Sequence, residues 1–141
     1  MVTVELASDA LERALVFTIR GAVFVAEQQV PVDEEPDSRD RDADHLLARL
    51  DGSPVGTGRM VVEGEQGLLG RLAVLPHARG TGAGKALVDG LEERAAKRGL
   101  AVVELHAQLH ARGFYERLGY AAHGERFLEA GIPHLHMRKE L

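Results

Sequence analysis

The sequence predicts an α/β fold, and three observations support this prediction. Segments with the two-residue alternation of a half-buried strand are interspersed with segments whose apolar residues recur at helical spacing. Three consecutive strands, separated by short turns, stand in the middle of the chain. The length of 141 residues suits one hydrophobic core. We therefore expect a single domain over residues 1–141, in which helices flank one sheet.

The first element is a strand over Val2–Leu6, where apolar and polar residues alternate. Ser8 or Asp9 can cap the helix that follows, because both side chains accept hydrogen bonds from the first turn. Its apolar residues recur every four positions, which predicts a helix to about Phe24 or beyond. Residues 31–44 then form an acidic loop, with seven carboxylates and only two arginines.

The second half of the chain begins with three antiparallel strands and continues with alternating helices and strands. The strands of this meander are expected at His45–Leu50, Val55–Val62 and Leu68–Leu75. Gly99 is a suitable residue to end the helix that follows. The remaining elements are expected as a helix over 82–98, a strand over 101–105, a short helix over 109–118, and strands over 120–124 and 134–139.

Composition excludes several classes of protein. No apolar run reaches the roughly 18 residues that a membrane span needs, and we expect no signal peptide. The absence of cysteine excludes disulfides, thiolate metal sites and a cysteine nucleophile. A net charge of −5 and only 4% aromatic residues argue against a nucleic-acid partner. We expect a cytoplasmic protein that binds neither membrane nor nucleic acid.

The most informative stretch is Arg79-Gly-Thr-Gly-Ala-Gly84, between a predicted strand and a predicted helix. Glycines leave the backbone N–H groups accessible at a helix N-terminus, where the dipole is positive, so this stretch predicts a phosphate or pyrophosphate site. It is no Walker A loop, because Gly84-Lys85 is followed by Ala86 instead of a hydroxyl residue. The spacing of Gly80, Gly82 and Gly84 also differs from a Rossmann fingerprint.

Two motifs together resemble one family. Arg79-x-x-Gly82-x-Gly84 matches the Arg/Gln-x-x-Gly-x-Gly/Ala signature of the GNAT acyl-CoA transferases. The later segment Gln108-Leu-His-Ala-Arg-Gly-Phe-Tyr-Glu-Arg-Leu-Gly-Tyr120 resembles their Asn-x-x-Ala-x-x-Phe-Tyr-Glu-x-x-Gly-Phe/Tyr motif, with Gln in place of Asn. Residues 20–31, 106–108 and 131–134 look like the ElaA/YjcF-like branch. The resemblance implies a GNAT fold: a mixed, mostly antiparallel sheet flanked by helices and splayed at the cofactor-binding strand.

The resemblance also implies acetyl-CoA as the acyl donor. We expect no metal, because no Asp or Glu stands at a recognisable ligand spacing from the histidines. Backbone N–H groups of the glycine loop would bind the pyrophosphate, with Arg79 ordering the loop or adding charge. A strand edge would pair with the pantetheine arm, and Phe114 would pack beneath its end or in the core. The implied cofactor-binding residues are Leu72, Ala73, Val74, Arg79, Gly80, Thr81, Gly82, Ala83, Gly84 and Phe114.

Transfer of acetyl to an amine needs a proton donor for the thiolate and an acceptor for the amine proton. Tyr115, in the second motif, is the candidate acid, since a phenol keeps its proton at neutral pH. Glu27 follows the apolar stretch Val23–Ala26, so we expect partial burial to raise its pKa and make it the base or amine anchor. The rivals of Glu27 are His45, His106, His134 and a water chain.

The candidate acceptor-binding residues are Arg20, His106, Gln108 and His134. Arg20 either pairs with a nearby acidic residue or binds a substrate carboxylate, and the acidic loop either attracts a cationic acceptor or only connects elements. The interpretation is an N-acetyltransferase that acts by direct attack in a ternary complex on a small-molecule or protein amine. The resemblance is also compatible with a homodimer. The alternatives are a non-catalytic acyl-CoA-binding module and a nucleotide-binding protein.

Overall fold

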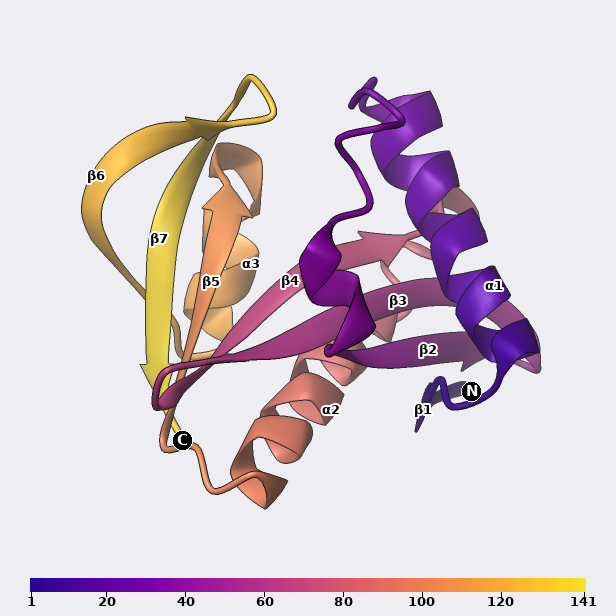
Figure 1. Cartoon of the computed structure of the whole chain (residues 1–141), viewed down its shortest axis with the longest axis horizontal. Helices are drawn as coiled ribbons and strands as arrows, with labels where there is room; N and C mark the ends of the chain where they lie inside the picture. The colour runs from indigo at the N-terminus through magenta and orange to yellow at the C-terminus, as the bar shows by residue number, and fades with distance from the viewer.

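The computed structural model describes residues 1–141, which form one seven-stranded sheet with the order β1-β2-β3-β4-β5-β7-β6 (Figure 1). Only the β4–β5 pair is parallel, and every other neighbouring pair is antiparallel. This confirms the predicted mixed, mostly antiparallel sheet. The strands are β1 Val2–Leu6, β2 Asp44–Leu50, β3 Ser53–Glu63, β4 Gln66–Val74, β5 Val102–Gln108, β6 Ala121–Glu129 and β7 Ile132–Glu140.

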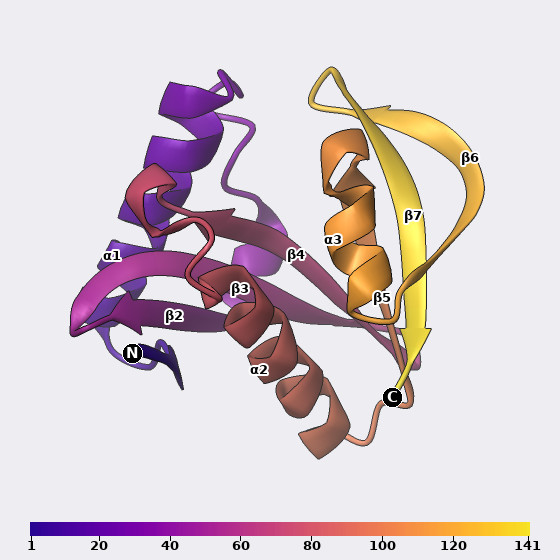
Figure 2. The same cartoon turned by 180° about the vertical axis from the view of Figure 1, so that it is seen from behind.

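Helices cover both faces of the sheet. The helix α1 (Ala10–Arg20), capped by Asp9, lies on one face and continues into a π-helix, η1 (Gly21–Glu27). The helices α2 (Ala83–Lys97) and α3 (Arg112–Arg117) lie on the other face, as the two opposite views show (Figures 1 and 2). Three short 3-10 helices complete the fold: η2 Ser38–Arg41, η3 Pro76–Ala78 and η4 Leu109–Ala111.

The core is divided by the sheet, because side chains alternate between its faces. Leu46 packs in the larger cluster, beneath α2, while its neighbour Leu47 packs in the cluster beneath α1. Both leucines are almost fully buried. The sheet can therefore bury apolar side chains on both faces while its strand ends stay free to form a site.

The strands β4 and β5 separate along their length. They pair only over Gly67–Leu69 and Val103–Leu105, and beyond these residues they diverge (Figure 1). The β5-facing edge of Gly70–Val74 consequently has no strand partner. This is the predicted splay, and it opens a cleft in the middle of the sheet.

The predicted strand ends of the C-terminal third were too conservative. β5 continues to Gln108, and β6 and β7 form a hairpin whose turn is Ala130-Gly131, with positive φ angles of 51° and 75°. Residues 125–133, which lie between the two predicted strands, therefore belong mostly to the hairpin. The pairing of β5 with β7 sets the directions of the side chains of His106, Gln108 and His134. In this register His106 lies opposite His136, and Gln108 lies opposite His134.

The acidic loop has a role that neither sequence expectation described. Three of its carboxylates, on Glu35, Asp37 and Asp40, bind arginines from α1, β3 and β4. The other carboxylates of residues 33–42 are exposed. Arg20 bonds to Glu35 and Asp40, and Arg59 bonds to Asp37 and Asp40. These ion pairs between loop carboxylates and arginines hold the loop against the sheet, next to the cleft.

Candidate functional site

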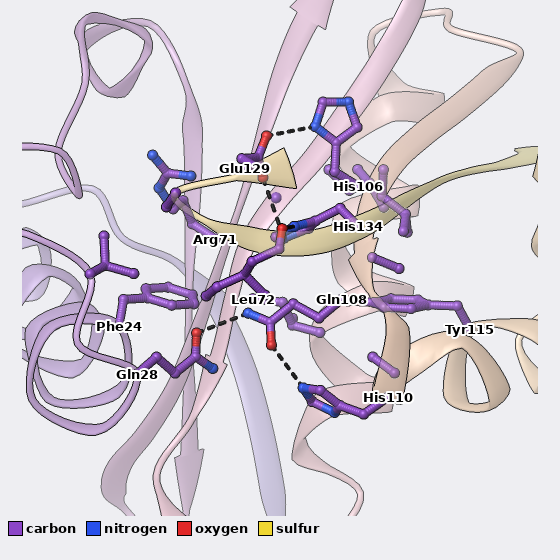
Figure 3. A pocket seen from close by; sticks show the side chains of 18 of the residues that line it. Phe24, Gln28, Arg71, Leu72, His106, Gln108, His110, Tyr115, Glu129 and His134 are labelled. Atoms are coloured by element: carbon purple, nitrogen blue, oxygen red, sulfur yellow. Dashed lines mark hydrogen bonds and ion pairs between the residues drawn. The ribbon is translucent and has the colours of Figure 1, made fainter. Parts of the chain in front are cut away.

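A cavity of about 360 Å³ lies where β4 and β5 separate (Figure 3). Its walls are the diverging halves of these strands, η1 with the residues after it, α2, the η4–α3 segment and the β6–β7 hairpin. The cavity extends from α3 on one face of the sheet to η1 and the hairpin on the other. Two reacting groups can thus approach each other from opposite faces of the sheet.

The glycine loop forms the start of α2. Gly82 is the N-cap residue with a φ of 91°, and Gly80 has a φ of 81°, which are left-handed conformations that other residues rarely adopt. No side chain caps the helix, so its first N–H groups stay available to an anion. Thr81 bonds through its hydroxyl to the carbonyl of Ala78 and orders the turn. A Cβ at Gly84 would approach Phe114 to 3.3 Å, so Phe114 packs directly over the loop.

The strand β4 carries a bulge where it borders the cavity. The register with β3 shifts between Thr57 and Arg59, and Arg71 on the opposite strand has a φ of 49°. A bulge re-aims the residues that follow it. Leu72 reaches the cavity, whereas the side chain of Ala73 is buried beneath α1 and Val74 packs beside the start of α2.

Tyr115 lies in the cavity wall with its ring edge-on to Phe114, at 5.0 Å between centroids. It is 9% exposed, and burial raises its pKa to about 12. The phenol therefore keeps its proton throughout the neutral range. The structure thus brings Tyr115, Phe114 and the glycine loop together, as the two motifs suggested.

The expectation for Glu27 was wrong in its electrostatics. The carboxylate is exposed at the end of η1, and the guanidinium of Arg79 forms two hydrogen bonds with it, at 2.6 and 2.8 Å. These bonds lower its pKa instead of raising it. Glu27 does not line the cavity. A carboxylate held in this way is a poor proton acceptor for an amine in the cavity.

Arg20 also lies outside the cavity. Its side chain is 1% exposed, and Glu35 and Asp40 bind the guanidinium at 2.6 and 2.7 Å. Of the two possibilities considered for Arg20, the structure shows the ion pair. His45 is buried elsewhere too, where its Nε2 contacts the carbonyl of Asp40.

His106 and His134 line the opposite end of the cavity from Tyr115, and Glu129 lies between them (Figure 3). Nδ1 of His106 is 2.9 Å from one Glu129 oxygen, and Nε2 of His134 is 3.5 Å from the other. Glu129 was not predicted, because it stands in a segment between the two predicted strands to which no element was assigned. No three His, Cys, Asp or Glu side chains lie where they could hold a metal ion.

A chain of side-chain hydrogen bonds crosses the cavity. Gln108 donates to Gln28 of the opposite wall at 2.9 Å, and its oxygen lies 2.7 Å from Nε2 of His110 (Figure 3). Gln28 and His110 were not predicted. Gln28 and Gln108 are 80 residues apart in the sequence, so no local sequence pattern predicts their hydrogen bond.

The model of the acetyltransferase (GNAT) domain matches residues 12–141 of this chain. The chain belongs to the GNAT acetyltransferase family. The N-acetyltransferase YjcF of Bacillus subtilis is 40% identical over 125 residues, which cover 88% of this chain and 89% of YjcF. The structure of an acyl-CoA N-acyltransferase from Pseudomonas aeruginosa is 32% identical in sequence, with a TM-score of 0.84. The match covers 99% of this chain and 98% of the Pseudomonas chain.

Escherichia coli ElaA has a similar structure, with 26% identity and a TM-score of 0.86 over 99% of this chain and all of ElaA. These similarities confirm the ElaA/YjcF-like branch and identify this GNAT protein as an acyltransferase. No helix is both long and apolar enough to cross a membrane. The cleft between β4 and β5 is the candidate active site of this GNAT enzyme.

Proposed function

We propose that this GNAT protein transfers acetyl from acetyl-CoA to a primary amine by direct attack in a ternary complex. The observation that carries the proposal is a single cavity that reaches both Tyr115 on one face of the sheet and the His106–Glu129–His134 group on the other. Proximity in such a cavity converts a bimolecular reaction into an effectively intramolecular one. The chain has no cysteine to hold the acetyl group covalently, which supports direct attack.

Residues of the glycine loop would hold the cofactor. The N–H groups of Gly80–Gly84 and the positive end of α2 suit a pyrophosphate. Arg79 would order the loop, because its guanidinium bonds to Glu27 and to the carbonyl of Val74. The unpaired edge at Leu72–Val74 suits an extended pantetheine arm, which would bond to it as an added strand does. Phe114 would pack against that arm. Acetyl-CoA, when bound, supplies the activated thioester.

Tyr115 is proposed as the general acid. Its raised pKa keeps the phenol protonated, so it can give its proton to the leaving sulfur. An N–H group on the open edge of β4 would polarise the acetyl carbonyl, the role of an oxyanion hole. His106, Gln108 and His134 are proposed to contact the acceptor, because they line the end of the cavity away from Tyr115.

The test is a calorimetric titration with acetyl-CoA, followed by thiol release in the presence of spermidine, lysine methyl ester, tyramine or kanamycin. Gly82→Trp should abolish binding, because its side chain would occupy the open space over the loop. Gly64→Trp is the matched control, since Gly64 also has a positive φ and open space but lies in the β3–β4 turn. Acetyl-CoA binding without amine-dependent thiol release would favour a non-catalytic module, and no binding would reject the proposal.

A further inference from the structure

The hairpin residue Glu129 and the strand residue His134 face each other with an unmet need for a hydrogen-bond donor. Nδ1 of His134 lies 2.6 Å from the carbonyl oxygen of Ile132. A carbonyl oxygen only accepts, so the proton of a neutral His134 is on Nδ1 and Nε2 carries a lone pair. That lone pair faces Oε2 of Glu129 at 3.5 Å. Two acceptors at this distance need a shared donor.

Glu129 is held in position for this contact by its other oxygen. Nδ1 of His106, 2.9 Å away, donates to Oε1, and this hydrogen bond lowers the pKa of Glu129 although partial burial acts in the opposite sense. The carboxylate is therefore ionised at neutral pH. Its second oxygen remains directed at His134, in the wall of the cavity. The pair offers one negative charge and two acceptor atoms to a ligand. Arg71 also lines the cavity and acts on Glu129, but its guanidinium is bonded to the carbonyl of Glu35 and to the carboxylate of Asp37.

We propose that Glu129 and His134 form the binding site for the ammonium group of the acceptor, and that Nε2 of His134 takes its proton. A primary ammonium has three N–H donors, so one can bond to Glu129 and another to His134 while the nitrogen stays in the cavity. An imidazolium formed at His134 would be stabilised by the adjacent carboxylate. The inference rests on the proposed acetyl transfer and names its acceptor class, a cationic primary alkylamine.

The proposed reaction balances in protons and bonds. The ammonium loses one proton to Nε2 of His134, and the nitrogen lone pair attacks the acetyl carbonyl carbon. The C–N bond forms and the C–S bond breaks, while Tyr115 gives its proton to the sulfur and regains one from the new amide nitrogen. His134 then releases its proton to solvent. One ammonium and one thioester thus give one amide, one thiol and one proton.

Binding of a simple ammonium tests the site without turnover. The probe is n-butylammonium, and n-butanol at the same pH of about 8 is the uncharged comparison. NMR of the imidazole resonances, with His134 identified by its loss in His134→Gln, should show a saturable shift with butylammonium and none with butanol. The nitrogen spectrum should show Nε2 of free His134 without a proton.

The decisive variant is Glu129→Gln, which keeps the shape of the side chain and removes its charge. It should abolish the butylammonium shift. Glu104→Gln is the matched control, because Glu104 is also a strand carboxylate bonded to a histidine, His123, but lies outside the cavity. An equal response to butanol, a protonated Nε2 in the free protein, or a shift that survives Glu129→Gln would each overturn the inference.

Kinetics separates this inference from the proposed function. Once an amine substrate is found, Glu129→Gln should raise the KM for that amine about tenfold or more, the effect of losing a hydrogen bond between charged groups. The KM for acetyl-CoA should not change. If the unaltered enzyme acetylates no amine, the proposed function fails while the ammonium site can still be detected. If it acetylates amines and Glu129→Gln leaves the amine KM unchanged, the inference fails alone.

Discussion

Arg79 and Glu27, 52 positions apart, are joined by two hydrogen bonds between guanidinium and carboxylate. Arg79 also donates from Nε to the carbonyl of Val74, at 3.0 Å. One side chain thus links the glycine loop, the end of β4 and the end of η1. Because residues of η1 form part of the cavity wall, this ion pair holds Arg79, at the start of the glycine loop, against an element of the candidate site.

The variant Glu27→Gln tests whether Glu27 is the general base. Loss of a general base lowers kcat by about 10²–10⁴-fold. We expect a decrease of less than about tenfold, because Glu27 is outside the cavity and its pKa is lowered by Arg79. Steady-state kinetics at saturating acetyl-CoA would measure it. A hundredfold or larger loss of kcat would restore Glu27 as the base.

The variant Tyr115→Phe should lower kcat by about 10²–10⁴-fold, because it removes the proposed proton donor and keeps the ring. The affinity for acetyl-CoA, measured by calorimetry, should change little. Tyr120→Phe is the control: Tyr120 is also buried, but its hydroxyl donates to Glu92 at 2.8 Å outside the cavity. Similar losses of kcat in both variants would indicate a structural role for Tyr115.

The variant Arg20→Met tests the buried ion pairs of the acidic loop. It leaves the buried carboxylate of Glu35 without its closest partner, and we expect the free energy of unfolding to fall by about 3–5 kcal/mol. Arg39→Met, which breaks an exposed pair with Glu63, should cost less than about 1 kcal/mol. Urea denaturation measures both. Equal costs would contradict a structural role for Arg20.

Acid should weaken the same network through Asp40. Burial alone would raise its pKa, but hydrogen bonds from Arg20, the Asp37 backbone and Arg59 outweigh burial and hold it at about 2. An unfolded aspartate has a pKa of about 3.9, so the stabilisation is complete above about pH 4 and is lost as pH falls through 2. Asp40→Asn should reduce this pH dependence in denaturation experiments.

The exposed loop residue Asp33 provides the control for this experiment. Asp33→Asn should leave the slope of stability against pH below pH 4 unchanged, because its carboxylate is open to solvent. If Asp40→Asn had the same slope as the unaltered protein, the ion pairs of Asp40 would contribute nothing to acid sensitivity.

Local patterns predicted much of the fold and one side of the candidate site. The glycine loop is readable because three glycines between a strand and a helix determine where backbone N–H groups are exposed. Tyr115 and Phe114 follow from a contiguous motif on a short helix. The splay of β4 and β5 followed from family resemblance. Each of these features depends on residues close together in the chain or on a recognised pattern.

By itself the sequence determined the order of elements, the position of the glycine-rich loop before α2 and the family to which the chain belongs. Only the tertiary structure decided which charged side chains meet: Glu27 with Arg79, Arg20 with Glu35, and Glu129 with His106 and His134. The physical reason is that the pKa and the binding partners of a charged side chain depend on its burial and on the groups around it. Both are set by strand register and by the packing of segments distant in sequence, which no local spacing encodes.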